Sequence, residues 1–200
     1  MNIYPNLLEN LIEYFKKLPG IGTRTAERYA LSLINMDEDE LNDFADAIKE
    51  IKKTFQECEI CGHLTDSSVC HICEDDSRNH DLICVVEDYK SIFMFEKTGN
   101  YNGIYHVLNG LISPIDGINP DDLNITKLVK RCEANKNLEV IIALKPSIEG
   151  DTTTLYLKKI LEQKNIKITR LSYGIPIGAD LDYLDILTLE RALMDRKEIS

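Results

Sequence analysis

Residues 18–28 read Leu18-Pro-Gly-Ile-Gly-Thr-Arg-Thr-Ala-Glu-Arg28, and this stretch decides the fold of the N-terminal part of the chain. Apolar residues with the spacing of amphipathic helices lie on both sides of it: Leu7, Leu8, Leu11, Ile12, Phe15 and Leu18, then Ala26, Tyr29, Ala30, Leu33 and Ile34. Between them, Gly20 and Gly22 allow positive φ and a close backbone approach, and Ile21 can fill the core of the hairpin. The stretch therefore predicts two helices joined by a tight turn.

The second of these helices begins with groups that suit a phosphate. Its free backbone N–H groups and its dipole favour an anion, we expect Thr23 to cap it, and Arg24 and Arg28 lie one turn apart on one face. The stretch resembles the helix-hairpin-helix motif of proteins that bind DNA without sequence specificity. The alternative is a hairpin whose glycine turn is only structural. The candidate DNA contacts are Lys16, Lys17, Gly20, Gly22, Thr23, Arg24 and Arg28.

Composition and charge narrow the class of protein. The chain has 200 residues, 44% hydrophobic and 28% charged, enough for one large or two small domains. We find no apolar run long enough to span a membrane and no signal-peptide pattern, so we expect a cytoplasmic, nucleoid-associated protein. The net charge of −11 disfavours a general nucleic-acid binder, yet residues 16–28 hold four cations against Glu27, a local charge of +3. This predicts weak, salt-dependent DNA binding that needs several copies or a partner.

Four of the six cysteines form two Cys-x-x-Cys knuckles separated by eight residues: Cys58, Cys61, Cys70 and Cys73. Four thiolates at this spacing favour tetrahedral zinc, and Gly62 supplies the tight turn that a knuckle needs. Two disulfides are the alternative, but a cytosolic protein is a poor setting for them. A site closed by four sulfurs predicts a structural Zn²⁺, with His63 and His71 as bystanders.

The patterns along the chain predict an α+β protein of several parts. We assign residues 1–57 to an all-helical region, 58–75 to a compact zinc finger, 80–175 to an α/β domain, and 176–200 to a C-terminal segment for packing or oligomer contacts. Short apolar runs predict strands in a mostly parallel sheet, buried on both faces, at 82–86, 105–108, 140–144 and 166–171. Helical spacing predicts helices at 41–55 (after Asp37 as cap), 89–97, 121–133, 152–163 and 184–196.

Carboxylates follow two of the predicted strands. Glu87 comes directly after the first, and Glu149 and Asp151 follow the third, with Gly150 between them for a sharp turn. Because ligands gather at the carboxyl ends of parallel strands, these side chains are expected to cluster and to suit Mg²⁺. This arrangement resembles the Toprim domain of topoisomerases and primases. The alternative is that acidic residues occupy exposed loops and that Asp151 caps the next helix.

A helical hairpin, a four-cysteine finger and a Toprim-like sheet, in this order, resemble the RecR family of bacterial recombination mediators over essentially the whole chain. Besides the four cysteines, the segments that carry the resemblance are 18–22, 85–88, 103–108, 111–117, 146–151 and 173–183. Three positions depart from the family pattern. Tyr173 replaces an arginine, Asp151 replaces a glutamate or second acid, and Lys145 replaces an asparagine and would neutralise part of the acidic cluster.

The resemblance implies a DNA-repair factor that is not an enzyme. Members form homotetramer rings that encircle DNA, single- or double-stranded, and act with RecO and RecF to load RecA onto single-stranded gaps. Hairpins line the ring, which assigns DNA contact to Arg24 and Arg28, whereas the acidic Toprim face contacts partners. Two alternatives remain: an Mg²⁺-dependent Toprim nuclease that uses Glu87, Glu149 and Asp151, and a zinc-stabilised protein-interaction module that binds no DNA.

Overall fold

The computed structural model describes residues 3–135, 137–164, 166–172, 174–196 and 198, so Tyr173, which departs from the family pattern, lies outside the described residues. The chain divides into two compact units, residues 1–54 and residues 55–200. None of the helices in the described ranges combines the length and the apolar character that crossing a bilayer requires.

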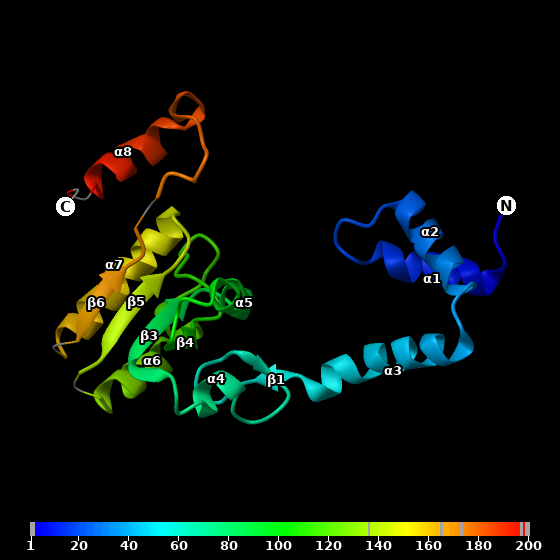
Figure 1. The fold of residues 1–200 in the computed structure, drawn as a ribbon, viewed down its shortest axis with the longest axis horizontal. Coiled ribbons are helices and arrows are strands. Elements are labelled where there is room, and N and C mark those ends of the chain that lie inside the picture. The colour runs from blue at the N-terminus through cyan, green and yellow to red at the C-terminus, as the bar shows by residue number, and fades with distance from the viewer. Residues whose placement is uncertain (1–2, 136, 165, 173, 197, 199–200) are drawn as a thin grey trace. The chain divides into compact units, whose positions relative to one another are not determined.

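The first unit is helical, as predicted. It contains α1 (Asn6–Lys16), α2 (Thr23–Leu33) and α3 (Glu38–Thr54), drawn in blue to cyan in Figure 1. Ile12, Ala26 and Ala30 form the buried centre between α1 and α2, and Phe15 and Ile21 pack against it. The two alanines let the helix backbones approach closely, and Ile21 fills the hairpin core as the sequence indicated.

Helix α3 has the predicted apolar face, but it buries none of its residues. Phe44, Ile48 and Ile51 are 41%, 57% and 57% exposed, and Phe55 just beyond the helix is 46% exposed. We call the three residues within the helix, Phe44, Ile48 and Ile51, the α3 stripe.

The second unit opens with a small two-stranded sheet. Strand β1 (Gln56–Glu57) pairs antiparallel with β2 (Leu64–Thr65), and the short helix α4 (His71–Glu74) follows. The prediction that residues 1–57 are all helical is therefore wrong at its last two residues. Their backbone pairs with β2 and belongs to the zinc finger.

A four-stranded parallel sheet forms the rest of this unit, and it confirms the predicted α/β architecture. Its order is β4-β3-β5-β6, made from β3 (Asn79–Val86), β4 (Gly103–Val107), β5 (Glu139–Ala143) and β6 (Lys167–Arg170). The described helices of this part are α5 (Tyr89–Thr98), α6 (Ile125–Glu133), α7 (Ile148–Glu162) and α8 (Ile186–Met194), with short 3-10 turns at Pro120–Asp122 and Leu181–Tyr183. Figure 1 shows β3 inside the sheet, between β4 and β5.

The two central strands differ in burial. Every residue of β3 from Ile83 to Val86 is 2% exposed or less, so both faces of this strand are covered, as predicted. In β5, Val140 and Ile142 are buried, but Glu139, Ile141 and Ala143 are half-exposed. The prediction of a fully buried third strand is therefore wrong. An apolar run does not reveal that one face of its strand is covered only in part.

Two helix boundaries also differ from the prediction. Helix α7 begins at Ile148 rather than 152, because the Ser147 hydroxyl accepts a hydrogen bond from the Gly150 N–H (3.1 Å) and caps it. Asp151 therefore lies inside the first turn and does not cap the helix. The predicted helix 121–133 is split into a 3-10 turn and α6.

Candidate nucleic-acid interface and metal centre

The turn between α1 and α2 leaves the start of α2 open. Gly20 has a φ of 77°, which favours glycine, and the Ile21 N–H donates to the Leu18 carbonyl (3.2 Å). Gly22, not Thr23, occupies the N-cap position, and no described side chain caps the helix. The prediction that Thr23 is the cap is wrong, because Thr23 is already the first helical residue. A Cβ at Gly22 would meet no atom within 4 Å, so the space beside the N-terminus of α2 is open.

The candidate cations around this turn are not equivalent. Arg24 and Arg28 are exposed on α2, as the one-turn spacing predicts. Lys16 is held by Glu13 on its own helix, with Nζ 2.7 Å from Oε1. A surface pair of this kind contributes less than about 1 kcal/mol and exchanges readily, but it partly neutralises Lys16. Lys17, the C-cap residue of α1, is exposed, and its Nζ lies 4.8 Å from the centroid of the Tyr14 ring. Three exposed cations, Lys17, Arg24 and Arg28, therefore lie outside the Lys16–Glu13 pair.

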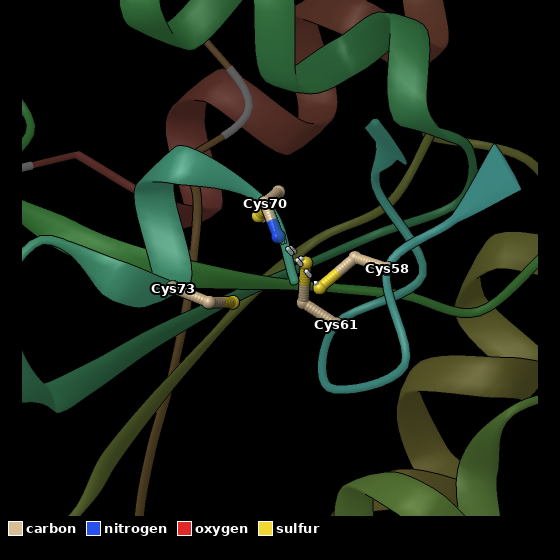
Figure 2. A group of neighbouring side chains, drawn as sticks. All are labelled: Cys58, Cys61, Cys70 and Cys73. Atoms are coloured by element: carbon tan, nitrogen blue, oxygen red, sulfur yellow. Dashed lines mark hydrogen bonds between the residues drawn. The ribbon is translucent and has the colours of Figure 1, made fainter. Parts of the chain in front are cut away.

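The second candidate site brings together the four cysteines that the sequence singled out (Figure 2). Cys58, Cys61 and Cys70 are buried, and Cys73 in α4 is half-buried. Their sulfur atoms lie within 4.8 Å of one another. Within the described ranges, no other group of three or more histidine, cysteine, aspartate or glutamate side chains has its ligand atoms this close together.

Backbone hydrogen bonds shape the loops that carry these sulfurs. The Gly62 N–H donates to the Cys58 carbonyl (2.9 Å), and the Cys58 N–H donates to the His63 carbonyl (2.7 Å). Two further N–H groups point at sulfur: that of Cys70 at the Cys58 Sγ (3.3 Å) and that of His63 at the Cys61 Sγ (3.4 Å). N–H donors of this kind stabilise thiolates. Gly62 has a φ of 77°, so it forms the turn predicted for the knuckle.

The electrostatics of the cluster also suit a cation. The Cys61 Sγ lies 3.6 Å from the Cys70 Sγ. Hydrogen bonding from Cys61 lowers the pKa of Cys70, and the same contact raises the pKa of Cys61. The second thiol of such a pair loses its proton readily only when a metal ion compensates the charge. Four sulfurs close a tetrahedral shell, so the cluster is consistent with one structural zinc, which would cross-link the two knuckles.

The two histidines near the cluster lie outside the group of four sulfurs, as predicted. His63 is 2% exposed, and its ring packs edge to face against Phe93, with centroids 5.2 Å apart. Burial lowers the pKa of His63. This side chain therefore serves as a neutral packing group under the knuckle.

The zinc knuckle is fixed to the sheet rather than tethered to it. The Val107 N–H at the end of β4 donates to the Cys61 carbonyl (2.7 Å). The Asn109 side chain donates to Glu57 in β1 (3.0 Å). A Cβ on Gly62 would lie 3.2 Å from the Val107 Cβ, so the two parts pack in direct contact.

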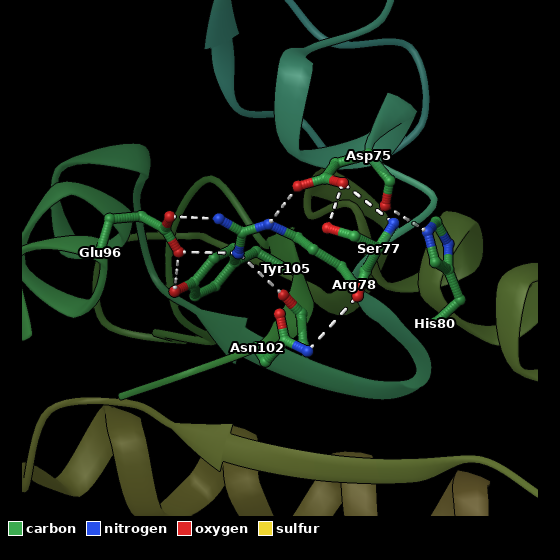
Figure 3. Close-up of polar contacts among 8 residues, drawn as sticks. Asp75, Ser77, Arg78, His80, Glu96, Asn102 and Tyr105 are labelled. Atoms are coloured by element: carbon green, nitrogen blue, oxygen red, sulfur yellow. Dashed lines mark hydrogen bonds and ion pairs between the residues drawn. The ribbon is translucent and has the colours of Figure 1, made fainter. Parts of the chain in front are cut away.

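The polar stretch after the knuckle contains an ordered clamp (Figure 3). Both terminal nitrogens of Arg78 donate to the Glu96 carboxylate, and Arg78 Nη1 also donates to the Gly103 carbonyl (3.1 Å). The Tyr105 hydroxyl donates to the same carboxylate (2.7 Å), and Asp75 lies 3.6 Å from Arg78 Nε. Arg78 is the main cause of the lowered pKa of Glu96. A bidentate arginine–carboxylate pair of this kind fixes orientation as well as charge.

The acidic residues at the carboxyl ends of the strands are not brought into one ligand group within the described ranges. Glu87 lies 3.3 Å from the Lys145 Nζ, and Asp151 accepts a hydrogen bond from Arg191 of α8 (2.7 Å). Glu149 lies in the first turn of α7, where hydrogen bonding to Ser147 lowers its pKa. The expectation of a single three-carboxylate cluster is corrected, because different cations hold two of the three. Lys145 contacts one of the three carboxylates, that of Glu87.

Gly150 has a different role from the sharp turn expected of it. It lies inside α7, and a Cβ there would overlap the Lys145 carbonyl oxygen. Only glycine allows this approach of helix and loop. The contact fixes the loop from which Lys145 reaches Glu87.

Four protein-family descriptions match successive parts of the chain. The RecR helix-hairpin-helix matches residues 8–52, the RecR four-cysteine zinc finger domain 56–75, the Toprim domain 81–172, and the RecR C-terminal region 174–197. The chain belongs to the RecR family. Membership implies a role in recombination repair, with DNA and repair proteins as partners, and RecR proteins are generally non-catalytic.

Sequence reasoning missed two cations of this RecR-family chain. Arg78 lies between the ranges predicted for the finger and the α/β domain, and Arg191 lies in the predicted helix 184–196 with no predicted site role. Arg78 contacts Glu96, and Arg191 contacts Asp151, 40 positions earlier in the chain. No local pattern signals such pairs, because the partners meet only when the sheet has formed.

Proposed function

We propose that this chain is a non-catalytic DNA clamp that, with RecO and RecF, promotes RecA loading at single-stranded gaps. The observation that carries the proposal is the α1–α2 hairpin. Its glycine turn leaves the α2 N-terminus uncapped by described side chains, and Arg24 and Arg28 are exposed on the same helix.

Phosphate is the ligand that this hairpin fits. The N–H groups of the first turn of α2 and the helix dipole attract an anion, and the open space at Gly22 admits a phosphodiester backbone. Arg24 and Arg28 add positive charge that can contact the phosphates of one DNA strand. Contacts to backbone phosphate carry no sequence information, so the binding is non-specific and falls steeply with salt.

A ring of several copies accounts for DNA binding by a chain of charge −11. Four weak basic hairpins acting on one DNA add their attraction through effective concentration. The α3 stripe supports self-association, because a set of exposed apolar side chains of this kind marks a protein contact. We assign to it a contact between copies in a homotetramer.

The acidic face of the Toprim domain is assigned to partner contact. Glu87 and Asp151 are each held by an internal cation, Lys145 and Arg191, in pairs that solvent reaches. A basic surface on RecO can replace Lys145 and Arg191 as the partner of these carboxylates at a small cost in free energy. The rival nuclease needs Glu87, Glu149 and Asp151 on one Mg²⁺, and the two ion pairs oppose that arrangement.

The test is fluorescence anisotropy of labelled DNA at two salt concentrations, with the wild type and Arg24→Ala/Arg28→Ala. We expect binding that weakens steeply with salt and falls at least about tenfold in the double variant. Lys158→Ala/Lys159→Ala, which removes two cations from α7, is the matched control and should bind as the wild type does. Equal binding by the wild type and the arginine variant would reject the clamp. Mg²⁺-dependent cleavage lost in Glu149→Ala would favour the nuclease.

A further inference from the structure

Each helix of the hairpin carries an exposed tyrosine, and a cation lies over the ring of each tyrosine. We propose that Tyr14 and Tyr29 stack on unpaired bases, so that the hairpin binds single-stranded DNA in preference to duplex. This inference rests on the proposed DNA contact of the same hairpin, and it names the class of DNA that the contact selects.

Tyr14 is the more accessible of the two rings. It is 65% exposed near the end of α1, and the Lys17 Nζ lies 4.8 Å from its ring centroid. The ring quadrupole attracts the cation to the ring face, and the 65% exposure of Tyr14 leaves much of this residue open to solvent. Lys17 is the C-cap residue of α1, and the Leu18–Gly22 turn that leads to the proposed phosphate site follows it in the chain. Ring and cation together offer one stacking face and one phosphate contact.

Tyr29 repeats this arrangement on α2. It is 39% exposed, and the Arg28 guanidinium carbon lies 5.6 Å from its ring centroid. Phe15 packs against the same ring edge to face, with centroids 5.9 Å apart, and holds it in place. A ring fixed in this way loses little entropy when a base stacks on it.

Only a single strand can use both features. In a duplex the base faces are stacked on one another, and a protein reaches phosphates and groove edges. Proteins that bind single strands without sequence preference combine a basic track with aromatic rings, and each stacked base contributes about 1–3 kcal/mol. Arg24 and Arg28 would then grip either form of DNA, whereas Tyr14 and Tyr29 would bind only the form with free bases.

The experiment compares full-length wild type with Tyr14→Leu and Tyr14→Phe on three labelled probes of equal length: oligo-dT, the same strand with abasic sites, and a duplex. Tyr14→Leu should lose about tenfold in affinity for oligo-dT and change by less than about twofold on the duplex. Tyr14→Phe keeps the ring and should bind as the wild type does. The wild type should bind the abasic strand more weakly than oligo-dT, and Tyr14→Leu should reduce this difference.

Tyr14 is the primary position because Tyr29 also packs on Phe15, and a change there would disturb the hairpin. Tyr156→Ala, an exposed tyrosine of α7, is the control and should leave all three affinities unchanged. Equal losses on single strand and duplex, no loss on either, or equal wild-type binding to abasic and intact strands would each overturn the inference. Loss in Tyr14→Leu without loss in Arg24→Ala/Arg28→Ala would instead reject the phosphate grip and leave the stacking role standing.

Discussion

The two units of this protein use apolar residues in opposite ways. Residues 55–200 bury a continuous core that includes Val85, Tyr105 and Leu157, each 0% exposed. In residues 1–54, three described hydrophobic residues are buried, and two of them are alanines. The larger side chains of α3 face outward. A core of this kind stabilises the second unit strongly, whereas the first unit has a small core and leaves large apolar side chains open to contacts with other molecules.

The ion pairs of the two units show the same difference. The described pairs of the helical unit join residues three positions apart on exposed helix surfaces, such as Lys49–Asp46 and Lys53–Glu50. Such pairs contribute little. In the second unit Arg78 and Glu96 are 18 positions apart and mostly shielded from water. Long-range clamps fix the second unit, and the first keeps its shape mainly through local helix contacts.

Loss of zinc should separate the behaviour of the two units most strongly. We expect Cys70→Ser to lose the metal and to unfold the knuckle, because structural zinc contributes roughly 10 kcal/mol to folding in small domains. The hydrogen bond from the Val107 N–H to the Cys61 carbonyl should be lost with the knuckle, so that hydrogen-exchange protection also falls in β4. The helices α1 and α2 should keep their hydrogen-exchange protection. Zinc stoichiometry and hydrogen exchange measure this. Cys132→Ala, a buried cysteine of α6, should keep one zinc per chain. Full zinc content in Cys70→Ser would contradict the site.

Gly150→Ala should have the next largest effect. The new Cβ would overlap the Lys145 carbonyl oxygen, so α7 or the loop must move. We expect a loss of roughly 3 kcal/mol in the free energy of unfolding of the second unit, measured by urea titration. Gly174→Ala, where a Cβ meets nothing within 4 Å, should be nearly neutral. Equal stability of the two variants would show that the close approach is wrong.

Acid should weaken the second unit through His106. Burial lowers the pKa of His106 from 6.5 to about 4, so the unfolded chain binds the proton first as the pH falls. The contribution of neutral His106 to the free energy of unfolding is complete above about pH 6.5 and is lost as the pH falls toward 4. The loss between pH 8 and pH 5 amounts to about 2 kcal/mol. His106→Asn should reduce the pH dependence by this amount in urea unfolding. His80→Asn, at an exposed position, should not, and an unchanged dependence in His106→Asn would refute this account.

The smallest effect on folding is expected on the α3 stripe. Ile48→Ser should change the free energy of unfolding of the dilute monomer by less than about 0.5 kcal/mol, because Ile48 is 57% exposed. The same variant should lower the mass of the assembly in light scattering. Leu31→Ser, on α2 and 42% exposed, serves as the control with unchanged mass. A large loss of monomer stability would mean that the stripe is covered within one chain.

Much of this fold follows from local patterns. The glycine turn, the four cysteines and the apolar runs determined the hairpin, the zinc knuckle and the parallel sheet, because each depends on residues close in sequence or on a strict spacing. The burial of β5 did not follow, since Ile141 and Ile142 look alike in sequence and only the helices decide which of them is covered. The acidic face did not follow either, because the positions of Lys145 and Arg191 depend on loop and helix packing.

The amino-acid sequence alone indicates which candidate groups the chain carries: a glycine turn at a helix N-terminus, four thiolates that suit one zinc, and carboxylates at strand ends. These depend on residue type and short spacing, which the chain fixes before it folds. Only the tertiary structure decided which charges meet. Arg78 reaches Glu96 and Arg191 reaches Asp151 because the sheet and its helices bring distant segments together. The energy of an ion pair depends on the distance between the partners and on their burial, and neither quantity can be obtained from local sequence patterns.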